Sequence, residues 1–493
     1  MAGVFSCVSE CSQSVCVQLD ASQCWFGVRA LPRPLTHRGL RTYAYGLAVP
    51  QDARKTIALA WLGLGMAALL ASGLFSVLLV LSRTPQLQAY FPVADFFRVA
   101  LVSHVDLSVL VWFLSFGGAL WTLTGDPRWQ TLAWCAFALA AAGTAALCLA
   151  PFVQVAIPVM ANYVPVLDGS VFLGGLTLFG TGIGLLCLRA MRVASPVGRY
   201  LTGDGALRFG LNAAMVATAV AGLTIAWSWL ALPYDMDTRA YYELLFWGGG
   251  HVLQFAYVLL MLIAWIWLAA LIGPGLALSP RILALLFGLA ILAVFLTPIT
   301  YLAYEVTSIE NHQWQTLLMR YGGGLVIGPI ALAVAWSLWP LAPLSPHLRP
   351  LRSSLLASMF LFVAGGLIGF FIRGSDVRIP AHYHGCIVGV TLALMGLSYH
   401  LLGQFGFTAP DSRTAAWQPV IYGGGQLLHI VGLVWSGGYG VQRKVAGADQ
   451  VLHSTQEILG MGLMGLGGLI AIVGGILFIG VVLQALLNTM KNP

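Results

Sequence analysis

Charge is the property that this sequence has least of. Asp, Glu, Lys and Arg make up 8% of its 493 residues, whereas hydrophobic residues make up 59%. Because an ordinary soluble domain is about one quarter charged, this composition does not supply the hydrophilic surface that a soluble body of this size needs. The net charge of +7 is too diffuse to indicate nucleic-acid binding. We therefore expect an integral membrane protein with no nucleic-acid partner.

Several cysteine motifs are also absent. The eight cysteines include no CxxC pair, no CxxCH haem-attachment motif and no cluster with histidine at zinc spacing. Four of them lie within the first 24 residues, which also lack the basic start, apolar middle and small-residue cleavage site of a signal peptide. We expect residues 1–55 to be a disordered leader, or an over-extended start of the reading frame.

Long apolar runs separated by short polar connectors fill the rest of the chain. A transmembrane helix needs about 20 apolar residues. Twelve such runs are present, at 56–82, 99–123, 131–154, 165–190, 209–233, 244–272, 281–305, 314–340, 354–373, 383–405, 417–440 and 455–487. The expected fold is an all-α polytopic bundle of twelve transmembrane helices, forming one domain from residue 56 to residue 490.

The positive charges predict how the bundle lies in its membrane. If the chain weaves regularly, the basic connectors fall on one side, which should be cytoplasmic. They carry Arg54, Lys55, Arg189, Arg192, Arg199, Arg208, Arg349 and Arg352. Both termini should then be cytoplasmic, in the inner membrane of a prokaryote. We find no continuous line of intramembrane acids and lysines from that side, which favours an enzyme that does not pump protons.

Five histidines are expected at one depth, near the outer ends of the helices. Any one of them alone is more often a packed polar residue than a ligand. Polar groups inside a bilayer are costly, however, and tend to mark functional interiors. A shared depth therefore indicates a common site for His104, His251, His312, His382 and His384. By the same count, His400 and His429 lie away from this layer and are expected to be structural.

The spacing of one histidine pair is informative. Residues two apart on an α-helix are about 200° apart around its axis, so His382 and His384 point to opposite sides and cannot bind one metal. Such a helix suits a position between two haems, because haem iron accepts an axial imidazole. His104 is the natural second axial partner for one of them.

Four motifs resemble those of the catalytic subunit of the haem-copper oxidase superfamily. They are Arg98 with His104, FWGGGHVLQ around His251, NHQW at residues 311–314 and AHYHG at residues 381–385. Their order and spacing match that family over essentially all of residues 56–490. The resemblance implies a membrane respiratory oxidoreductase.

The resemblance also implies a set of ligands and cofactors. His384 and His104 would bind a low-spin haem, and His382 would be the proximal ligand of a high-spin haem. His251 and His312 would hold a non-haem metal, copper or iron, opposite the open face of that second haem. Family members also place basic residues on haem propionates, and Arg443 and Lys444 lie in the matching outer connector. A plain solvated loop pair explains these two residues equally well.

Two departures from the family pattern bear on the chemistry. Adjacent histidines are usual where this chain has Asn311-His312, so an amide replaces one imidazole ligand. Imidazole favours copper, whereas oxygen ligands suit iron or another divalent ion. In oxygen-reducing members a tyrosine lies four residues after the His of the sixth helix, or early in the seventh. Here that position is Phe255, and the seventh run has only Tyr301 and Tyr304, near its end.

The missing tyrosine favours reduction of NO to N₂O, as in nitric oxide reductases of this superfamily. An oxygen-reducing terminal oxidase, taking electrons from cytochrome c or quinol, is the alternative if Tyr257 or Tyr304 reaches the site. A haem-binding sensor or assembly protein without turnover is a third reading. Gln254, Glu243, Glu305 and Glu310 are polar candidates near the site that surface or interhelical contacts explain equally well. Electrons should come from a partner subunit with a cytochrome c or copper centre on the outer face.

Overall fold

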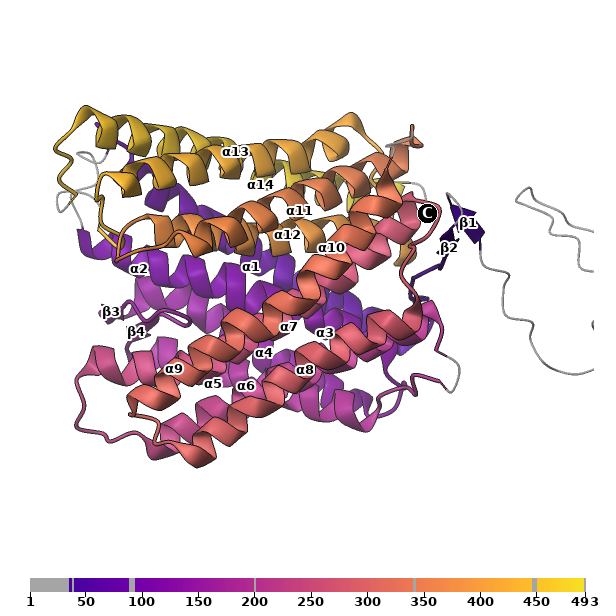
Figure 1. The fold of residues 1–493 in the computed structure, drawn as a ribbon, viewed down its shortest axis with the longest axis horizontal. Coiled ribbons are helices and arrows are strands. Elements are labelled where there is room, and N and C mark those ends of the chain that lie inside the picture. Colours follow the sequence, from indigo (N-terminus) through magenta and orange to yellow (C-terminus); the bar gives the residue numbers. More distant parts are fainter. Residues whose placement is uncertain are drawn as a thin grey trace, which may run out of the picture. The chain divides into compact units, whose positions relative to one another are not determined.

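The structure is a computed structural model that describes residues 35–37, 40–87, 94–198, 201–339, 343–445 and 450–491. Residues 1–34, including the early cysteines, and Arg199 lie outside the described residues. Leu35–Pro493 belong to one compact unit, and helices make up most of it. The expectation of an all-α polytopic membrane protein is confirmed (Figure 1).

Twelve long helical stretches are present in the described residues. Ten are single helices: α1 (Ala53–Arg83), α4 (Gln130–Val153), α5 (Ser170–Arg192), α6 (Gly203–Ala231), α7 (Thr238–Ile272), α8 (Pro280–Ala303), α11 (Arg349–Phe370), α12 (Arg378–Gln404), α13 (Arg413–Gly438) and α14 (Thr455–Lys491). A short 3₁₀ turn, η5 (Pro346–Leu348), precedes α11. By length and composition, eleven of the twelve stretches can cross a membrane, and α13 is the remaining one.

The other two stretches each contain a π-helical segment. One runs α2 (Ala94–Val105), η3 (Asp106–Val111) and α3 (Trp112–Thr124); the other runs α9 (Ile309–Leu317), η4 (Leu318–Gly323) and α10 (Gly324–Leu338). Such segments often occur at functional sites. Asp106, the first residue of η3, is fully buried, and its carboxylate has no hydrogen bond among the described residues.

Two short antiparallel hairpins accompany the helices. The strands β1 (Leu35–His37) and β2 (Leu40–Thr42) pair before α1, and β3 (Ile157–Val159) pairs with β4 (Val166–Asp168) between α4 and α5. The sequence predicted neither hairpin. The second one carries residues 160–165 to the end of the bundle where the expected site lies.

The part of the expected leader that the structure describes is packed rather than disordered. Tyr43 pairs with Leu276 through two backbone hydrogen bonds, and Tyr45 is 4% exposed with its hydroxyl donating to the Leu278 carbonyl. Apolar side chains at 47 and 49 are buried as well. The ordered unit therefore includes residues 40–52, ahead of the predicted start at 56.

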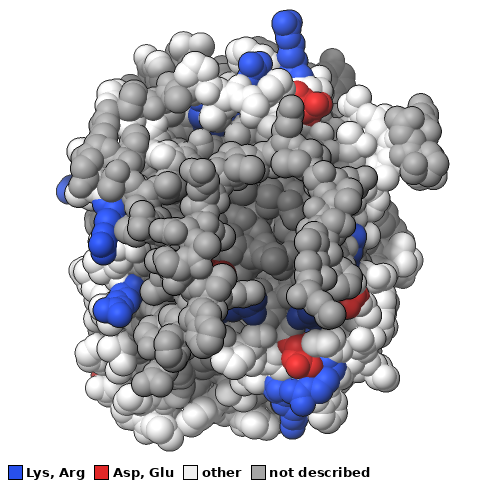
Figure 2. All heavy atoms as spheres, turned by 90° about the vertical axis from the view of Figure 1, so that its right-hand side faces the viewer, with Lys and Arg blue, Asp and Glu red and all other residues white. Residues whose placement is uncertain are grey.

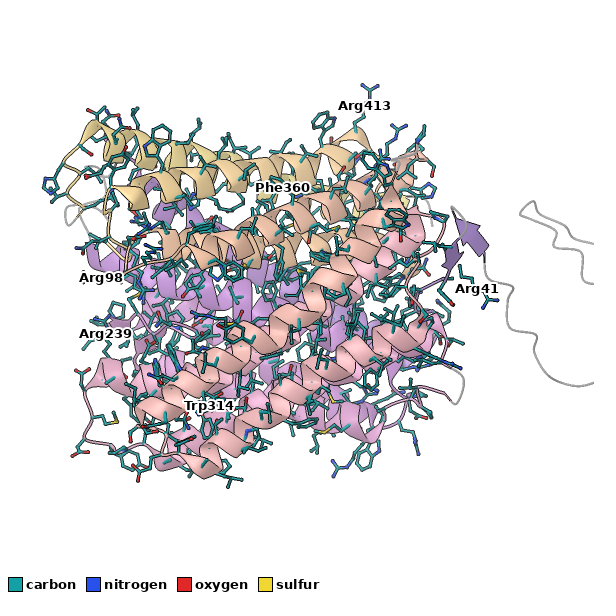
Figure 3. The ribbon with its side chains drawn as sticks, in the orientation of Figure 1. Arg41, Arg98, Arg239, Trp314, Phe360 and Arg413 are labelled. Carbon is teal, nitrogen blue, oxygen red and sulfur yellow. The ribbon has the colours of Figure 1, made fainter. Side chains whose placement is uncertain are left out.

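The core lies along α7 and α12, whose side chains are largely buried, whereas the surrounding helices expose apolar side chains. Phe360, on α11, is one of these outward residues and is labelled in Figure 3. Two consecutive hydrogen bonds join α7, α11 and α12. The Trp265 indole of α7 donates to Ser358 Oγ of α11 at 2.7 Å, and Ser358 donates to the Gly389 carbonyl of α12 at 2.6 Å. Because lipid offers no partner for such groups, this bonding favours burial of α7.

The two ends of the bundle differ in charge. We call the end at which α1 begins and α7, α12 and α14 end the basic end, and the opposite end, at which α12 begins, the histidine end. Arg41 and Arg413 lie at the basic end, and Arg98 and Arg239 at the histidine end (Figure 3). Viewed directly, the basic end shows Lys and Arg side chains at several points and fewer acids (Figure 2).

A glycine contact fixes how α11 and α12 cross. A Cβ atom on Gly385 would lie 2.4 Å from Gly365 Cα, and one on Gly365 would lie 2.5 Å from the Cys386 nitrogen. Since the neighbouring atoms belong to the backbone, a side chain at either position could be accommodated only if the two helices moved apart. Small residues allow such close approach between membrane helices. The contact brings the Gly365 carbonyl within reach of His382.

Replacing Gly365 by alanine tests this crossing. The added methyl group should lower the free energy of unfolding by about 1–3 kcal/mol, the usual cost of overpacking. Gly366→Ala is the control, because nothing lies within 4 Å of its Cβ position, and alanine is the better helix former. Thermal unfolding in detergent measures both. Equal melting temperatures for the two variants would contradict the close crossing.

Candidate haem and metal centre

Three imidazoles gather at the histidine end, from α2, α12 and α13. His104 Nδ1 lies 3.0 Å from the Ser72 carbonyl, His384 Nδ1 lies 3.2 Å from Gln426 Oε1, and His429 Nδ1 lies 2.9 Å from the Met464 carbonyl. The rings of His384 and His429 are 4.5 Å apart at 53°. We name this group the three-imidazole cluster: His104, His384 and His429.

The hydrogen bonds assign the tautomer of each ring in the three-imidazole cluster. A nitrogen that faces an oxygen acceptor carries the proton, so Nε2 keeps its lone pair. Within the described part of the chain, no hydrogen bond involves Nε2 of any of the three. Metal-binding histidines usually donate their second N–H in this way, so the cluster fits axial ligation of haem iron.

His429 was expected to be structural, but the structure places it beside His384. Sequence counting put it at a different depth, because the predicted span began at residue 383, whereas α12 begins at Arg378 and His384 therefore lies further into its helix. His400 lies elsewhere, with its ring 5.5 Å from that of Trp267. The cluster thus holds one more imidazole than a single haem needs.

His382 points away from the cluster, as the two-residue spacing predicts. Its Nδ1 lies 2.7 Å from the Gly365 carbonyl of α11, whereas His384 faces Gln426 of α13. No hydrogen bond to His382 Nε2 is present in the described ranges. The pair therefore offers one imidazole to each side of α12, and His382 fits the proximal ligand of a second haem.

The pair His251 and His312 meets around the indole of Trp247. The Trp247 ring stacks on His312 at 3.6 Å and 16°, and it lies 4.7 Å from the His251 ring. The indole nitrogen donates to the His312 carbonyl at 3.0 Å, and His251 Nδ1 lies 2.7 Å from the Trp247 carbonyl. One tryptophan therefore positions both imidazoles that the sequence assigned to the non-haem metal.

Asn311 and His312 lie on a helix, not in a loop. The hydroxyl of Ser308 accepts from the Asn311 nitrogen and caps α9, so the helix begins before the NHQW motif. Neighbouring residues on a helix point about 100° apart. The Asn311 amide donates to the Tyr304 carbonyl at 3.5 Å. Among the described residues, no hydrogen bond joins it to His251.

A tyrosine that lies outside all four sequence motifs contacts the site. Tyr163, in the connection between β3 and β4, has its hydroxyl 2.8 Å from His251 Nε2, with ring centroids 4.5 Å apart. Burial raises the pKa of Tyr163 well above its usual value, and the nearby Tyr383 and Glu243 raise it further. Its position depends on tertiary packing, which no local sequence pattern reports.

Arg443 and Lys444 line a cavity of about 320 Å³ at the histidine end. Arg443 Nη1 donates to Asn162 Oδ1 at 3.4 Å, and Lys444 Nζ donates to the Met160 carbonyl at 2.5 Å. Asn162 in turn donates to the Glu243 carboxylate. Arg239, labelled in Figure 3, completes the basic side of the cavity. These residues fit the binding of an anionic group such as a haem propionate.

The other acids sit differently. Glu305 and Glu310 are exposed, whereas Glu243 is partly buried among Asn162 and the basic side chains. Among the described residues, no three His, Cys, Asp or Glu side chains are close enough to surround one small ion.

Two relatives were found. An uncharacterized protein of Rickettsia prowazekii (strain Madrid E) is 29% identical over 495 residues, which cover 86% of this chain and 94% of that protein. An uncharacterized protein of Aquifex aeolicus (strain VF5) is 29% identical over 347 residues, covering 70% and 85%. No family model matches the sequence. The chain therefore resembles these two proteins over most of its length, and their names assign no activity.

Alanine variants of the three-imidazole cluster test whether two of its members are the axial pair expected from the sequence. We expect His104→Ala and His384→Ala to abolish a six-coordinate low-spin haem spectrum, and His429→Ala to keep it. The His429 ring packs on His384, so its loss should shift the spectrum without removing it. Optical spectroscopy of each purified variant decides. Loss of the signal in His429→Ala, with retention in His384→Ala, would exchange their roles.

Lys444 should make stability depend on pH. Burial lowers the pKa of Lys444 to about 8, and the positive charge of Arg443 adds to this effect. The unfolded chain, with a lysine pKa of about 10.4, binds more protons between pH 8 and pH 10. Stability should therefore rise with pH in this window. Thermal unfolding of wild type and Lys444→Gln at pH 7 to 10 tests this, and parallel profiles would contradict it.

Proposed function

We propose that the chain is the catalytic subunit of a membrane respiratory oxidoreductase of the haem-copper oxidase type, and that it reduces NO to N₂O. The observation that carries the proposal is the pair of imidazoles on opposite sides of α12. His382 and His384 are each held through Nδ1 by an oxygen of a different neighbouring helix, and each keeps Nε2 available.

The residues divide the work between two haems and one non-haem metal. His384, with His104, would hold a low-spin haem that receives electrons, and His382 would hold a high-spin haem. His251 and His312, positioned by Trp247, would hold the metal, and Arg443 and Lys444 would bind propionates. When bound, the high-spin haem and the metal would supply the two electrons that convert two NO and two protons to N₂O and water.

The surroundings of the expected tyrosine position support NO as the substrate. Phe255, four residues after His251, is 4% exposed, and its ring packs near Gly322 of η4. Tyr257 packs edge-on against Phe113 with ring centroids 4.9 Å apart. The Tyr304 carbonyl accepts from Asn311, and among the described residues no hydrogen bond joins either tyrosine to His251.

One observation favours the alternative, an oxygen-reducing terminal oxidase. The Tyr163 hydroxyl contacts His251 Nε2 from the β3–β4 connection. A tyrosine beside this histidine is the feature that oxygen-reducing members of the superfamily supply from the sixth helix itself or from the start of the seventh. Oxygen reduction is therefore the second candidate function.

The arrangement of charges supports the rest of the proposal. The histidine end would face outward and the basic end the cytoplasm, since cytoplasmic connectors carry the excess of Lys and Arg. The protein would then lie in a prokaryotic inner membrane. Its electron donor would be a subunit with a cytochrome c or copper centre on the outer face.

Gas consumption by the purified, reduced protein separates the candidate functions. We expect two haems and one non-haem metal per chain, NO consumption with one N₂O formed per two NO, and much slower O₂ consumption. His382→Ala should abolish turnover while keeping the low-spin spectrum, because the low-spin haem would be bound by His104 and His384. Fast O₂ turnover with little NO consumption would favour the oxidase. Haem binding with neither turnover would indicate a sensor.

A further inference from the structure

We propose that Tyr163 is an oxygen ligand of the non-haem metal held by His251. The inference rests on the proposed function for the presence of the metal, and it names a ligand that the sequence motifs do not contain. The donor set would be two imidazoles, from His251 and His312, and one phenolate.

The separation of the two donor atoms carries the inference. His251 Nε2 and Tyr163 Oη lie 2.8 Å apart. Two ligands that each bind one ion at about 2.0–2.1 Å, at an angle between 90° and the tetrahedral value, are separated by roughly 2.8–3.4 Å. The nitrogen and oxygen therefore lie at the separation of neighbouring ligands. They share a hydrogen bond, so both rings must turn their lone pairs toward an ion that binds between them.

The histidine is oriented for this role. Its Nδ1 is held by the Trp247 carbonyl at 2.7 Å, so the lone pair of Nε2 faces the tyrosine. The bond from Nδ1 to a carbonyl is the second interaction that metal-binding histidines usually make. The phenol would give up its proton when the oxygen binds the ion.

A glycine makes room for the phenol. A Cβ atom on Gly250, the residue before His251, would lie 2.3 Å from both Cβ and Cγ of Tyr163. Any other side chain at this position would push the tyrosine away from the imidazole. The FWGGGH motif therefore does two things: it supplies the histidine, and it opens the space through which a residue from another segment reaches it.

The backbone of Tyr163 is also held. Its neighbour Asn162 donates from both its backbone nitrogen and its amide to Glu243 of α7, the helix that carries His251. The Tyr163 and Trp247 rings are 5.7 Å apart, so the phenol and both imidazoles share contact with one indole. Side chains from three segments thus contact the Trp247 ring.

The donor types favour iron over copper. Soft sulfur and imidazole ligands suit copper, whereas two histidines with one carboxylate form a set that non-haem iron enzymes use. A phenolate would likewise supply one anionic oxygen. Asn311, the residue where a third imidazole is expected, turns its amide to the Tyr304 carbonyl instead. Tyr163 would supply the third donor from a different part of the chain.

Metal analysis and resonance Raman spectroscopy of the oxidised protein test the assignment. Wild type should contain one iron beyond its haem iron and should show phenolate vibrations excited in a phenolate-to-iron absorption band. Tyr163→Phe should lose these vibrations and bind the non-haem iron at least about tenfold more weakly. Tyr242→Phe is the matched control, because its buried hydroxyl donates to Asp168 at 2.9 Å. It should keep both signals.

The outcomes separate this inference from the proposed function. Wild type with two haems but no phenolate vibrations, or Tyr163→Phe with unchanged iron and vibrations, would overturn the ligand assignment alone. Wild type without haem would overturn the proposed function. If Tyr163→Phe does not fold, wild type grown on ring-deuterated tyrosine decides, since the vibrations must then shift. Vibrations that do not shift would reject tyrosine as the ligand.

Discussion

The rest of this structure depends on the cost of placing a polar ring in a bilayer. An imidazole away from water must donate the hydrogen bond of its N–H group to an acceptor, because an unpaired polar group there costs several kcal/mol. At His104, His382 and His429 a backbone carbonyl of another segment accepts, and at His384 a glutamine does. These bonds tie helix packing to the direction of the remaining nitrogen, so the same contacts shape the bundle and prepare the site.

Much of the fold could be predicted because its signals are local. A run of about 20 apolar residues has one stable outcome in lipid, a helix, so the ends of the twelve stretches agree with the predicted spans to within six residues. The opposite directions of His382 and His384 follow from helix geometry alone. The start of α9 could also have been predicted from the sequence. Ser308 is a good N-cap residue, and it stands three residues before Asn311, whose backbone nitrogen such a cap binds.

The rest of the candidate site could not be predicted, since it is made by contacts between distant segments. Tyr163 lies 88 positions from His251 and reaches it through a hairpin that no periodicity announces. His429 was misplaced because the predicted span put His384 at the very start of its helix, whereas α12 begins at Arg378. Whether a residue such as Asn311 faces a metal or a neighbouring carbonyl depends on a rotation of about one quarter turn around the helix axis. Predicted helix ends are too inexact to fix the direction of a side chain to that precision.

The π-helical segment η3 has a consequence for how one membrane crossing serves two neighbourhoods. A π turn takes up an additional residue, so every side chain after it is rotated by about 100° relative to an uninterrupted α-helix. The stretch from Ala94 to Thr124 therefore presents one direction at His104 and another from Trp112 onward, where α3 is buried on all sides. The π-helical segment thus divides one membrane-crossing helix into two parts with different side-chain directions. The part that carries His104 can therefore be oriented independently of α3, the part that packs in the core.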